Sequence, residues 1–187
     1  MIVYLHGFMS GPGSYKAMQF RDYMRQQARE HEYACPKLPP YPGQAIQQLE
    51  GWLATLAAPL CLIGSSLGGY YALWLAEKFA CRAVLVNPAI RPYDDLARYL
   101  GPQVSPYTDE AFTLAPCHID ELKAIDVPHI THPERYWLLS QTGDEVLDYR
   151  LGVEKLAGAR QTVIDDGDHS FQGFEAFIPA IDAFAHT

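Results

Sequence analysis

Residues 60–70 read Leu60-Cys61-Leu62-Ile63-Gly64-Ser65-Ser66-Leu67-Gly68-Gly69-Tyr70. The first four residues are apolar, as in a buried strand, and a run of helical period continues from Tyr70 to Phe79. Between strand and helix the sequence has the form Gly-x-Ser-x-Gly, in which a sharp turn strains the serine backbone and requires glycine neighbours. Ser66, unlike Ser65, has glycine two residues away on both sides. We therefore predict Ser66 as a nucleophile at the top of a sheet.

A glycine-rich turn in a nucleotide-binding sheet is the alternative interpretation of this segment. A dinucleotide fold requires the order Gly-x-Gly-x-x-Gly, which is absent here. A phosphate-binding loop requires a lysine after its glycines, and none follows. The segment therefore favours a serine nucleophile over a phosphate site.

The chain of 187 residues alternates short apolar runs with longer segments of helical period. This alternation favours a mostly parallel sheet with helices on both faces, and the length fits a single domain over residues 1–187. Six runs are predicted as strands, namely residues 2–5, 33–36, 60–63, 83–86, 136–139 and 162–164. Helices are predicted to begin near Ser14, Gln44, Ser66, Asp148 and Gly173. The prolines of residues 37–43 predict a loop.

The alternation is interrupted between the fourth and fifth predicted strands. About residues 88–134 contain no strand-like run, and prolines divide them into short pieces, with helices predicted around residues 94–100 and 118–125. An insertion of this length in a small domain is typical of a functional lid. We expect a helical lid whose apolar side chains either form an acyl pocket above the serine or simply fill the core. Those side chains are Tyr93, Leu96, Tyr99, Leu100, Tyr107, Phe112 and Leu114.

A serine hydroxyl becomes a strong nucleophile only when a base removes its proton, so a histidine is required. His169 follows the sixth predicted strand and completes the chain order Ser, acid, His that accompanies this type of turn. The acid is expected in the loop after the fifth predicted strand, where Asp144 follows a glycine. Glu145 is an alternative acid, whereas Asp148 is predicted to cap the next helix.

Acyl transfer also needs two donors for the oxygen that becomes negative in the transition state. The N–H of Leu67 is one candidate because Leu67 follows the nucleophile. The N–H of Phe8 is the other, since the residues after the first predicted strand turn the chain back toward the serine. His6 is expected to be buried, with its ring hydrogen-bonded to loop backbone.

Composition and charge exclude several other classes of function. The net charge of −8 disfavours nucleic acid as a partner, because a phosphate backbone requires clustered Lys and Arg. The four cysteines form no Cys-x-x-Cys pair, so buried free thiols are expected in place of disulfides. His129-x-x-His132 lacks further ligands at suitable spacing, and no metal is predicted. No apolar run reaches about 18 residues, and residues 1–7 do not resemble a signal peptide, so a cytoplasmic protein without a membrane span is expected.

Four segments together resemble the small YqiA-like esterases of bacteria, and the resemblance extends over essentially the full length. They are Leu5-His6-Gly7-Phe8, Gly64-Ser65-Ser66-Leu67-Gly68-Gly69, Gln141-Thr142-Gly143-Asp144-Glu145-Val146-Leu147-Asp148-Tyr149 and Gly167-Asp168-His169-Ser170-Phe171. The resemblance implies a three-layer α/β-hydrolase fold with a minimal six-stranded sheet in the order 2-1-3-4-5-6. It also implies carboxylesterase or acyl-thioesterase activity, a triad of Ser66, Asp144 and His169, and no cofactor.

The expected function is hydrolysis of a small-molecule acyl ester or thioester through an acyl-enzyme on Ser66. Acyl transfer or amide hydrolysis on the same triad is an alternative, because one scaffold supports many chemistries. A binding module with a vestigial site is a second alternative. The presence of all three triad residues in order disfavours it.

Overall fold

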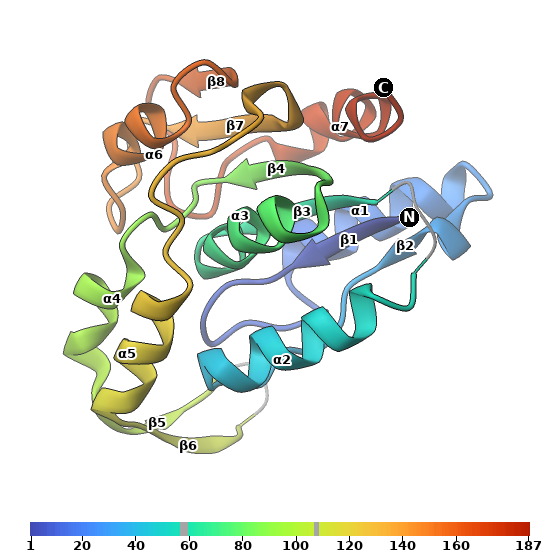
Figure 1. The fold of residues 1–187 in the computed structure, drawn as a ribbon. Coiled ribbons are helices and arrows are strands. Elements are labelled where there is room, and N and C mark those ends of the chain that lie inside the picture. The colour runs from blue at the N-terminus through green and yellow to red at the C-terminus, as the bar shows by residue number, and fades with distance from the viewer. Residues whose placement is uncertain (57–59, 107–108) are drawn as a thin grey trace.

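A computed structural model describes residues 1–56, 60–106 and 109–187. Its centre is a six-stranded sheet in which all neighbouring strands are parallel, in the order β2-β1-β3-β4-β7-β8 (Figure 1). The six predicted runs all fall on strands of this sheet. The strands are β1 Ile2–Leu5, β2 Tyr33–Ala34, β3 Cys61–Ser65, β4 Arg82–Val86, β7 Tyr136–Gln141 and β8 Arg160–Ile164. The predicted parallel sheet is confirmed, and its last strands are β7 and β8 because two additional strands precede them.

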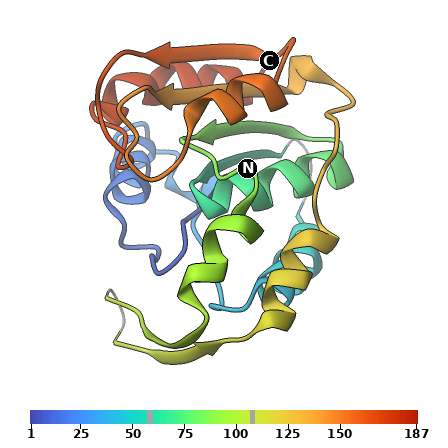
Figure 2. The ribbon, with the colours of Figure 1, turned by 90° about the vertical axis from the view of Figure 1, so that its left-hand side faces the viewer.

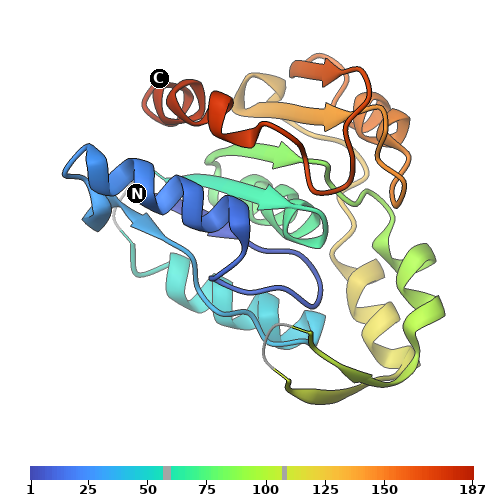
Figure 3. The same cartoon turned by 180° about the vertical axis from the view of Figure 1, so that it is seen from behind.

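Helices cover both faces of the sheet because successive strand side chains point to opposite sides. Ile2 and Tyr4 pack with α1 and α7, whereas Val3 and Leu5 pack with α2 and α3 on the other face (Figures 1 and 3). These helices and the associated turns are α1 Tyr15–Gln26, α2 Pro42–Leu53, α3 Leu67–Phe79, α6 Tyr149–Lys155, α7 Ile178–Ala185, η1 Glu30–Glu32 and η4 Phe174–Phe177. Within the described residues, no helix has the length and apolar character that a membrane crossing needs.

The insertion contains a β-hairpin, contrary to the expectation of an insertion without strands. β5 (Gly101–Val104) and β6 (Ala111–Leu114) pair antiparallel to each other and do not join the main sheet (Figure 2). In β6 the buried residues Phe112 and Leu114 alternate with exposed ones, the period of a half-buried strand. The run is short, and Pro102 in its partner argues against a strand, although an edge strand tolerates proline. The local sequence therefore contains only a weak strand signal.

The helical part of the insertion agrees with the sequence. It comprises α4 Pro92–Asp95, η2 Leu96–Tyr99, α5 Pro116–Ala124 and η3 Pro133–Arg135. Several polar contacts attach the insertion to the rest of the molecule, among them one from α5 and one beside the hairpin. Glu121 of α5 accepts the N–H of Gly43 at 2.9 Å. Lys37 forms an ion pair of 2.9 Å with Glu110 beside the hairpin.

Helix starts follow the sequence in part. The prolines predict a loop through residue 43, but Pro42 is the first residue of α2, where a helix tolerates proline because no N–H partner is needed. Asp148 caps α6 as predicted, since its Oδ1 accepts the N–H of Arg150 at 3.0 Å. Ser14 stands at the N-cap position of α1, but its side chain makes no capping hydrogen bond.

The four cysteines are free thiols. Cys61 and Cys81 are buried and Cys35 is half-buried, and burial raises the pKa of each of these thiols to about 12. Cys117 is exposed near the start of α5, so the expectation of a buried thiol is wrong there.

Candidate active site

Ser66 lies at the turn between β3 and α3, with backbone angles φ 55° and ψ −122°. A residue with a side chain adopts such a conformation only where the surrounding structure fixes it. A Cβ atom at Gly64 would lie 2.3 Å from the carbonyl oxygen of Gly68, and one at Gly68 would lie 2.0 Å from that of Leu5. The glycines of the motif are thus required by contact with backbone. The strained turn that the motif predicts is present.

The ring of His169 lies between Ser66 and Asp144. Its Nε2 is 3.1 Å from the Oγ of Ser66, and its Nδ1 is 2.9 and 3.0 Å from the two carboxylate oxygens of Asp144. Because an ionised carboxylate only accepts hydrogen bonds, Nδ1 carries the proton and donates a hydrogen bond to Asp144. Nε2 is then the acceptor for the hydroxyl of Ser66. The structure brings these three predicted residues together.

The carboxylate of Asp144 is held in place by backbone as well as by the histidine. Its side chain is 2% exposed, and its Oδ1 accepts the N–H groups of Val146 at 2.9 Å and Leu147 at 2.8 Å. Burial by itself raises the pKa of this carboxyl, but the hydrogen bonds from His169 and the two N–H groups outweigh it and hold the pKa below its ordinary value. Asp144 therefore stays ionised opposite the imidazole.

The neighbouring acids have other partners. Glu145 accepts the backbone N–H of His169 through Oε2 at 3.0 Å and does not contact the ring. Asp148 caps α6 and pairs with Arg150 at 2.7 Å. The geometry thus separates Asp144 from the two alternatives in its loop. The support that Glu145 gives to the histidine backbone is not predicted from the sequence.

Two amide side chains fix the loop of His169, and the sequence analysis identifies neither of them. Asn87 follows β4, and its Nδ2 donates to the carbonyl oxygens of Asp168 at 2.9 Å and His169 at 3.2 Å. Its Oδ1 accepts the N–H of Gln141 at 2.9 Å. The side chain of Gln141 accepts the N–H groups of Asp168 and Gln172 at 3.2 and 2.8 Å. A polar amide at the end of a buried strand is the only sequence signal for this role.

Phe8 lies in the loop after β1, and Leu67 is the first residue of helix α3. Within the part of the chain that the structure describes, neither of their backbone N–H groups donates to a protein acceptor. Both residues line one cavity together with Ser66 and His169. The loop of Phe8 passes close to the nucleophile, since a Cβ atom at Gly7 would lie 3.3 Å from the Cβ of Ser66. Two residues with a backbone N–H that has no described acceptor therefore border the same cavity as the nucleophile.

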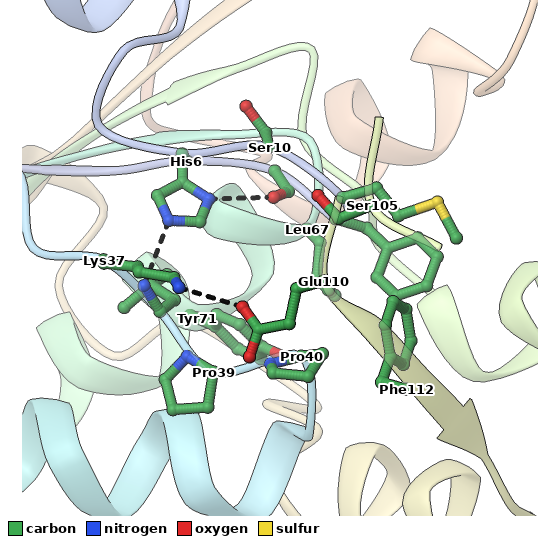
Figure 4. A pocket seen from close by; sticks show the side chains of 14 residues that line it. His6, Ser10, Lys37, Pro39, Pro40, Leu67, Tyr71, Ser105, Glu110 and Phe112 are labelled. Carbon is green, nitrogen blue, oxygen red and sulfur yellow. Dashed lines mark hydrogen bonds and ion pairs between the residues drawn. The ribbon is translucent and has the colours of Figure 1, made fainter. Parts of the chain in front are cut away.

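The ring of His6 is buried and bonded to loop backbone, as expected. Its Nδ1 lies 3.0 Å from the carbonyl oxygen of Gly7, and its Nε2 accepts the N–H of Leu38 at 3.1 Å (Figure 4). Nδ1 therefore carries the proton, and burial lowers the pKa of the ring below its ordinary value. A neutral His6 ties the loop of Phe8 to the proline-rich segment before α2.

Two cavities adjoin Ser66 and His169. The first, which we call the insertion cavity, has a volume of about 280 Å³ and a mainly apolar lining that includes Met9, Leu67, Leu96, Tyr99, Val146 and Leu147. The second, which we call the Lys16 cavity, has a volume of about 230 Å³ and a lining of mixed polarity that includes Phe8, Ser10, Tyr15, Lys16 and Ser170. The environment of Ser66 thus offers one mainly apolar space and one of mixed polarity that contains a lysine.

Only some of the apolar side chains expected above the serine line a cavity beside it. Leu96 and Tyr99 line the insertion cavity, and the ring of Tyr99 meets that of Phe8 edge-on at 5.8 Å. Phe112 also meets Phe8 edge-on, at 5.9 Å, and lines a smaller cavity beside the Lys37–Glu110 ion pair (Figure 4). The others line neither of the two cavities beside Ser66: Leu114 is buried, Tyr93 packs on the core, Leu100 is exposed, and Tyr107 is outside the described residues.

Among residues 1–56, 60–106 and 109–187, no three His, Cys, Asp or Glu side chains are grouped so that they could hold a metal ion. His132, from the His-x-x-His pair, contacts Glu134 at 3.0 Å.

The sequence profile described as "Uncharacterised protein family (UPF0227)" matches residues 1–186. The chain belongs to the UPF0227 family. This is the family of the YqiA-like proteins, so the resemblance seen in the sequence is confirmed.

Solved structures similar to this UPF0227 chain are α/β-hydrolases. Mouse alpha/beta hydrolase domain-containing protein 10 is 17% identical with a TM-score of 0.73, covering 99% of this chain and 89% of its own. An esterase domain from a Rhodothermus marinus protein is 18% identical with a TM-score of 0.67, covering 98% and 85%. A monoacylglycerol lipase from Paleococcus ferrophilus is 15% identical with a TM-score of 0.65, covering 99% and 93%. The predicted α/β-hydrolase fold is confirmed.

Proposed function

We propose that this UPF0227 chain is a serine hydrolase that cleaves carboxylic esters or thioesters through an acyl-enzyme on Ser66. The observation that carries the proposal is the continuous set of hydrogen bonds from Ser66 Oγ to His169, at 3.1 Å, and from His169 to Asp144, at 2.9 Å. Phe8 and Leu67, whose backbone N–H groups have no described acceptor, line a cavity together with Ser66 and His169. The names of the esterase and lipase neighbours support the same reaction class.

In the first half of the reaction, the Oγ of Ser66 attacks the carbonyl carbon while its proton passes to Nε2 of His169. The carbonyl π electrons move to oxygen, where the N–H groups of Phe8 and Leu67 stabilise the negative charge. Asp144 holds the proton at Nδ1 and stabilises the imidazolium. When the tetrahedral intermediate collapses, the C–O or C–S bond breaks and His169 gives its proton to the leaving oxygen or sulfur.

In the second half, water replaces the alcohol or thiol. His169 accepts a proton from water, whose oxygen attacks the acyl carbon, and a second tetrahedral intermediate forms. Its collapse breaks the bond to Oγ, which takes the proton back from His169, and the carboxylic acid leaves. Every proton moves among Ser66, His169, the leaving group and water, so the cycle balances without a cofactor.

We propose further that residues 88–134 act as a lid and that the insertion cavity binds the acyl chain. Apolar side chains such as Leu96 and Tyr99 line this cavity next to Ser66. Burial of a methylene group stabilises binding by about 0.8 kcal/mol, so an apolar chain gains affinity with length until the cavity is filled.

The experiment is labelling with a fluorophosphonate probe, followed by intact-mass measurement. One probe molecule is expected per wild-type chain, and none on Ser66→Ala. Ser65→Ala is a matched control, because Ser65 lies next to Ser66 but does not contact His169 in the structure, and it should label like the wild type. Full labelling of Ser66→Ala would overturn the assignment.

A further inference from the structure

The Lys16 cavity contains a cation that the proposed mechanism does not use. Lys16 is the second residue of α1, and its Nζ donates to the carbonyl oxygen of Ser170 at 2.7 Å. Among the residues that the structure describes, it makes no other hydrogen bond and no ion pair. Because an ammonium group has three N–H donors, Lys16 retains donors for a bound molecule.

The side chain of Lys16 is half-buried and forms no ion pair with a described carboxylate. Burial lowers the pKa of Lys16 to about 8, although the carboxylates of Asp168 and Asp144 act in the opposite direction. Neither carboxylate lines the cavity, and none of the described lining residues is Asp or Glu. Asp144 is engaged by His169, and one oxygen of Asp168 is engaged by Gln172. Lys16 therefore forms no ion pair with a described carboxylate, although Asp168 and Asp144 already act on its charge, and its remaining N–H donors are available to a ligand anion.

Other groups of the cavity favour an anion in the same place. Ser10 and Ser170 belong to its lining and can contribute hydroxyl donors. The first residues of α1, Tyr15 and Lys16, also line it, and their backbone N–H groups donate to no described acceptor. The start of a helix carries partial positive charge, which adds to that of the ammonium group.

The cavity is continuous with the reacting groups, since Ser66 and His169 belong to its lining. An anion bound at Lys16 is therefore attached to a substrate only a few bonds from the bond that breaks. The apolar insertion cavity has a different character and suits the acyl chain. The two parts of an ester would then occupy two spaces of matching polarity.

We propose that the Lys16 cavity binds a carboxylate or phosphate carried on the alcohol or thiol part of the substrate, close to the scissile bond. This inference rests on the proposed function and specifies its substrate class as esters or thioesters of short anionic alcohols or thiols.

The test compares three esters of butanoic acid that differ only in the alcohol. They are propyl butanoate, 3-(butanoyloxy)propanoate and 3-(butanoyloxy)propyl phosphate, and the release of butanoate is measured at pH 7. For the wild type, we expect kcat/KM of at least one anionic ester to exceed that of propyl butanoate by about tenfold or more, which corresponds to a single favourable charge contact. The ester with the larger advantage identifies the anion as carboxylate or phosphate.

Variants then attribute the preference to Lys16. The ratio of kcat/KM for the anionic and the neutral ester should fall close to one in Lys16→Met and remain well above one in Lys16→Arg. Lys123→Met removes the same charge from an exposed position on α5 and should keep the wild-type ratio. The ratio is informative even if the loss of the contact with Ser170 changes absolute rates.

The outcomes separate this inference from the proposed function. Equal rates on all three esters, or a preference that persists in Lys16→Met, would overturn the role of Lys16 and leave the serine hydrolase intact. If neither the neutral nor the anionic esters are cleaved and no probe labels Ser66, the proposed function fails, and this inference fails with it.

Discussion

Glu145 binds His169 through the main chain, whereas Asp144 binds it through the ring. Glu145 Oε2 accepts the histidine N–H at 3.0 Å, and both oxygens of Asp144 face Nδ1 at 2.9 and 3.0 Å. Two adjacent carboxylates therefore have separable functions. One orients the proton on the imidazole, and the other supports the loop that carries it.

We therefore predict that Asp144→Asn lowers kcat by about 10⁴, because the amide favours the wrong histidine tautomer. Glu145→Gln, which keeps an acceptor oxygen for the N–H of His169, should change kcat by less than about tenfold. Steady-state kinetics on a p-nitrophenyl ester measures both. A severe loss in Glu145→Gln with a mild one in Asp144→Asn would show that the acid is Glu145.

The amide of Asn87 is predicted to position His169 without touching the substrate. Asn87→Ala removes bonds to the carbonyl oxygens of Asp168 and His169 and leaves the N–H of Gln141 without its acceptor. A buried polar group that loses its partner costs about 1–3 kcal/mol, and a displaced catalytic group costs up to about 10² in rate. The midpoint temperature of thermal unfolding and kcat should both fall, whereas KM should stay nearly unchanged. Gln26→Ala changes an exposed amide at the end of α1, far along the chain from this loop, and is expected to behave like the wild type.

The insertion cavity predicts a limited acyl-chain length. In a series of p-nitrophenyl esters, kcat/KM should rise by about fourfold per methylene and then level off when the cavity is full, as follows from about 0.8 kcal/mol per methylene. Leu96→Trp should shorten the optimal chain by about two carbons, because the side chain of Leu96 lines the cavity. Leu100→Trp, at a 41% exposed position, is the matched control. Rates that are independent of chain length would show that the cavity does not bind the acyl group.

The preference for an anionic alcohol is predicted to depend on pH. The pKa of Lys16 is lowered to about 8, so the cation is present below this pH and is lost as the pH rises through it. Because kcat/KM reports the ionisation of the free enzyme, the advantage of the anionic ester should decline above pH 8. The other ionisable groups around the cavity act on both esters, and division by the rate on the neutral ester removes their common effect. These groups are Tyr4, His6, Tyr15, Asp144, Asp168 and His169. An advantage that is constant from pH 7 to about pH 10 would contradict this assignment.

The sheet and the triad could be predicted from the sequence because their signals are local. Buried parallel strands form continuous apolar runs, and the turn at Ser66 requires glycines at fixed spacing. The chain order of Ser66, Asp144 and His169 then follows from the topology. In the sequence, Asp144 is distinguished from Glu145 by its place nearer the strand and by the glycine before it, and the structure adds the contact with the ring.

The remaining features depend on contacts between distant segments. Asn87 and Lys16 appear in the sequence as ordinary polar residues, and their partners in the loop after β8 lie more than 80 residues away. The sequence does not predict the hairpin of β5 and β6, because its strands are short and one contains Pro102. The hairpin is supported instead by a tertiary contact, the edge-on packing of Phe112 against Phe8. Such contacts leave no periodic signal in the sequence.

The most direct test of the central claim is to trap the acyl-enzyme. Wild-type protein is mixed with excess p-nitrophenyl butanoate, quenched in acid within milliseconds, digested and analysed by mass spectrometry. We predict a butanoyl group on Ser66 in the wild type and in Ser65→Ala, and slower formation of the same adduct in Asp144→Asn. A butanoyl group on another residue, or undiminished turnover of the ester by Ser66→Ala, would contradict it.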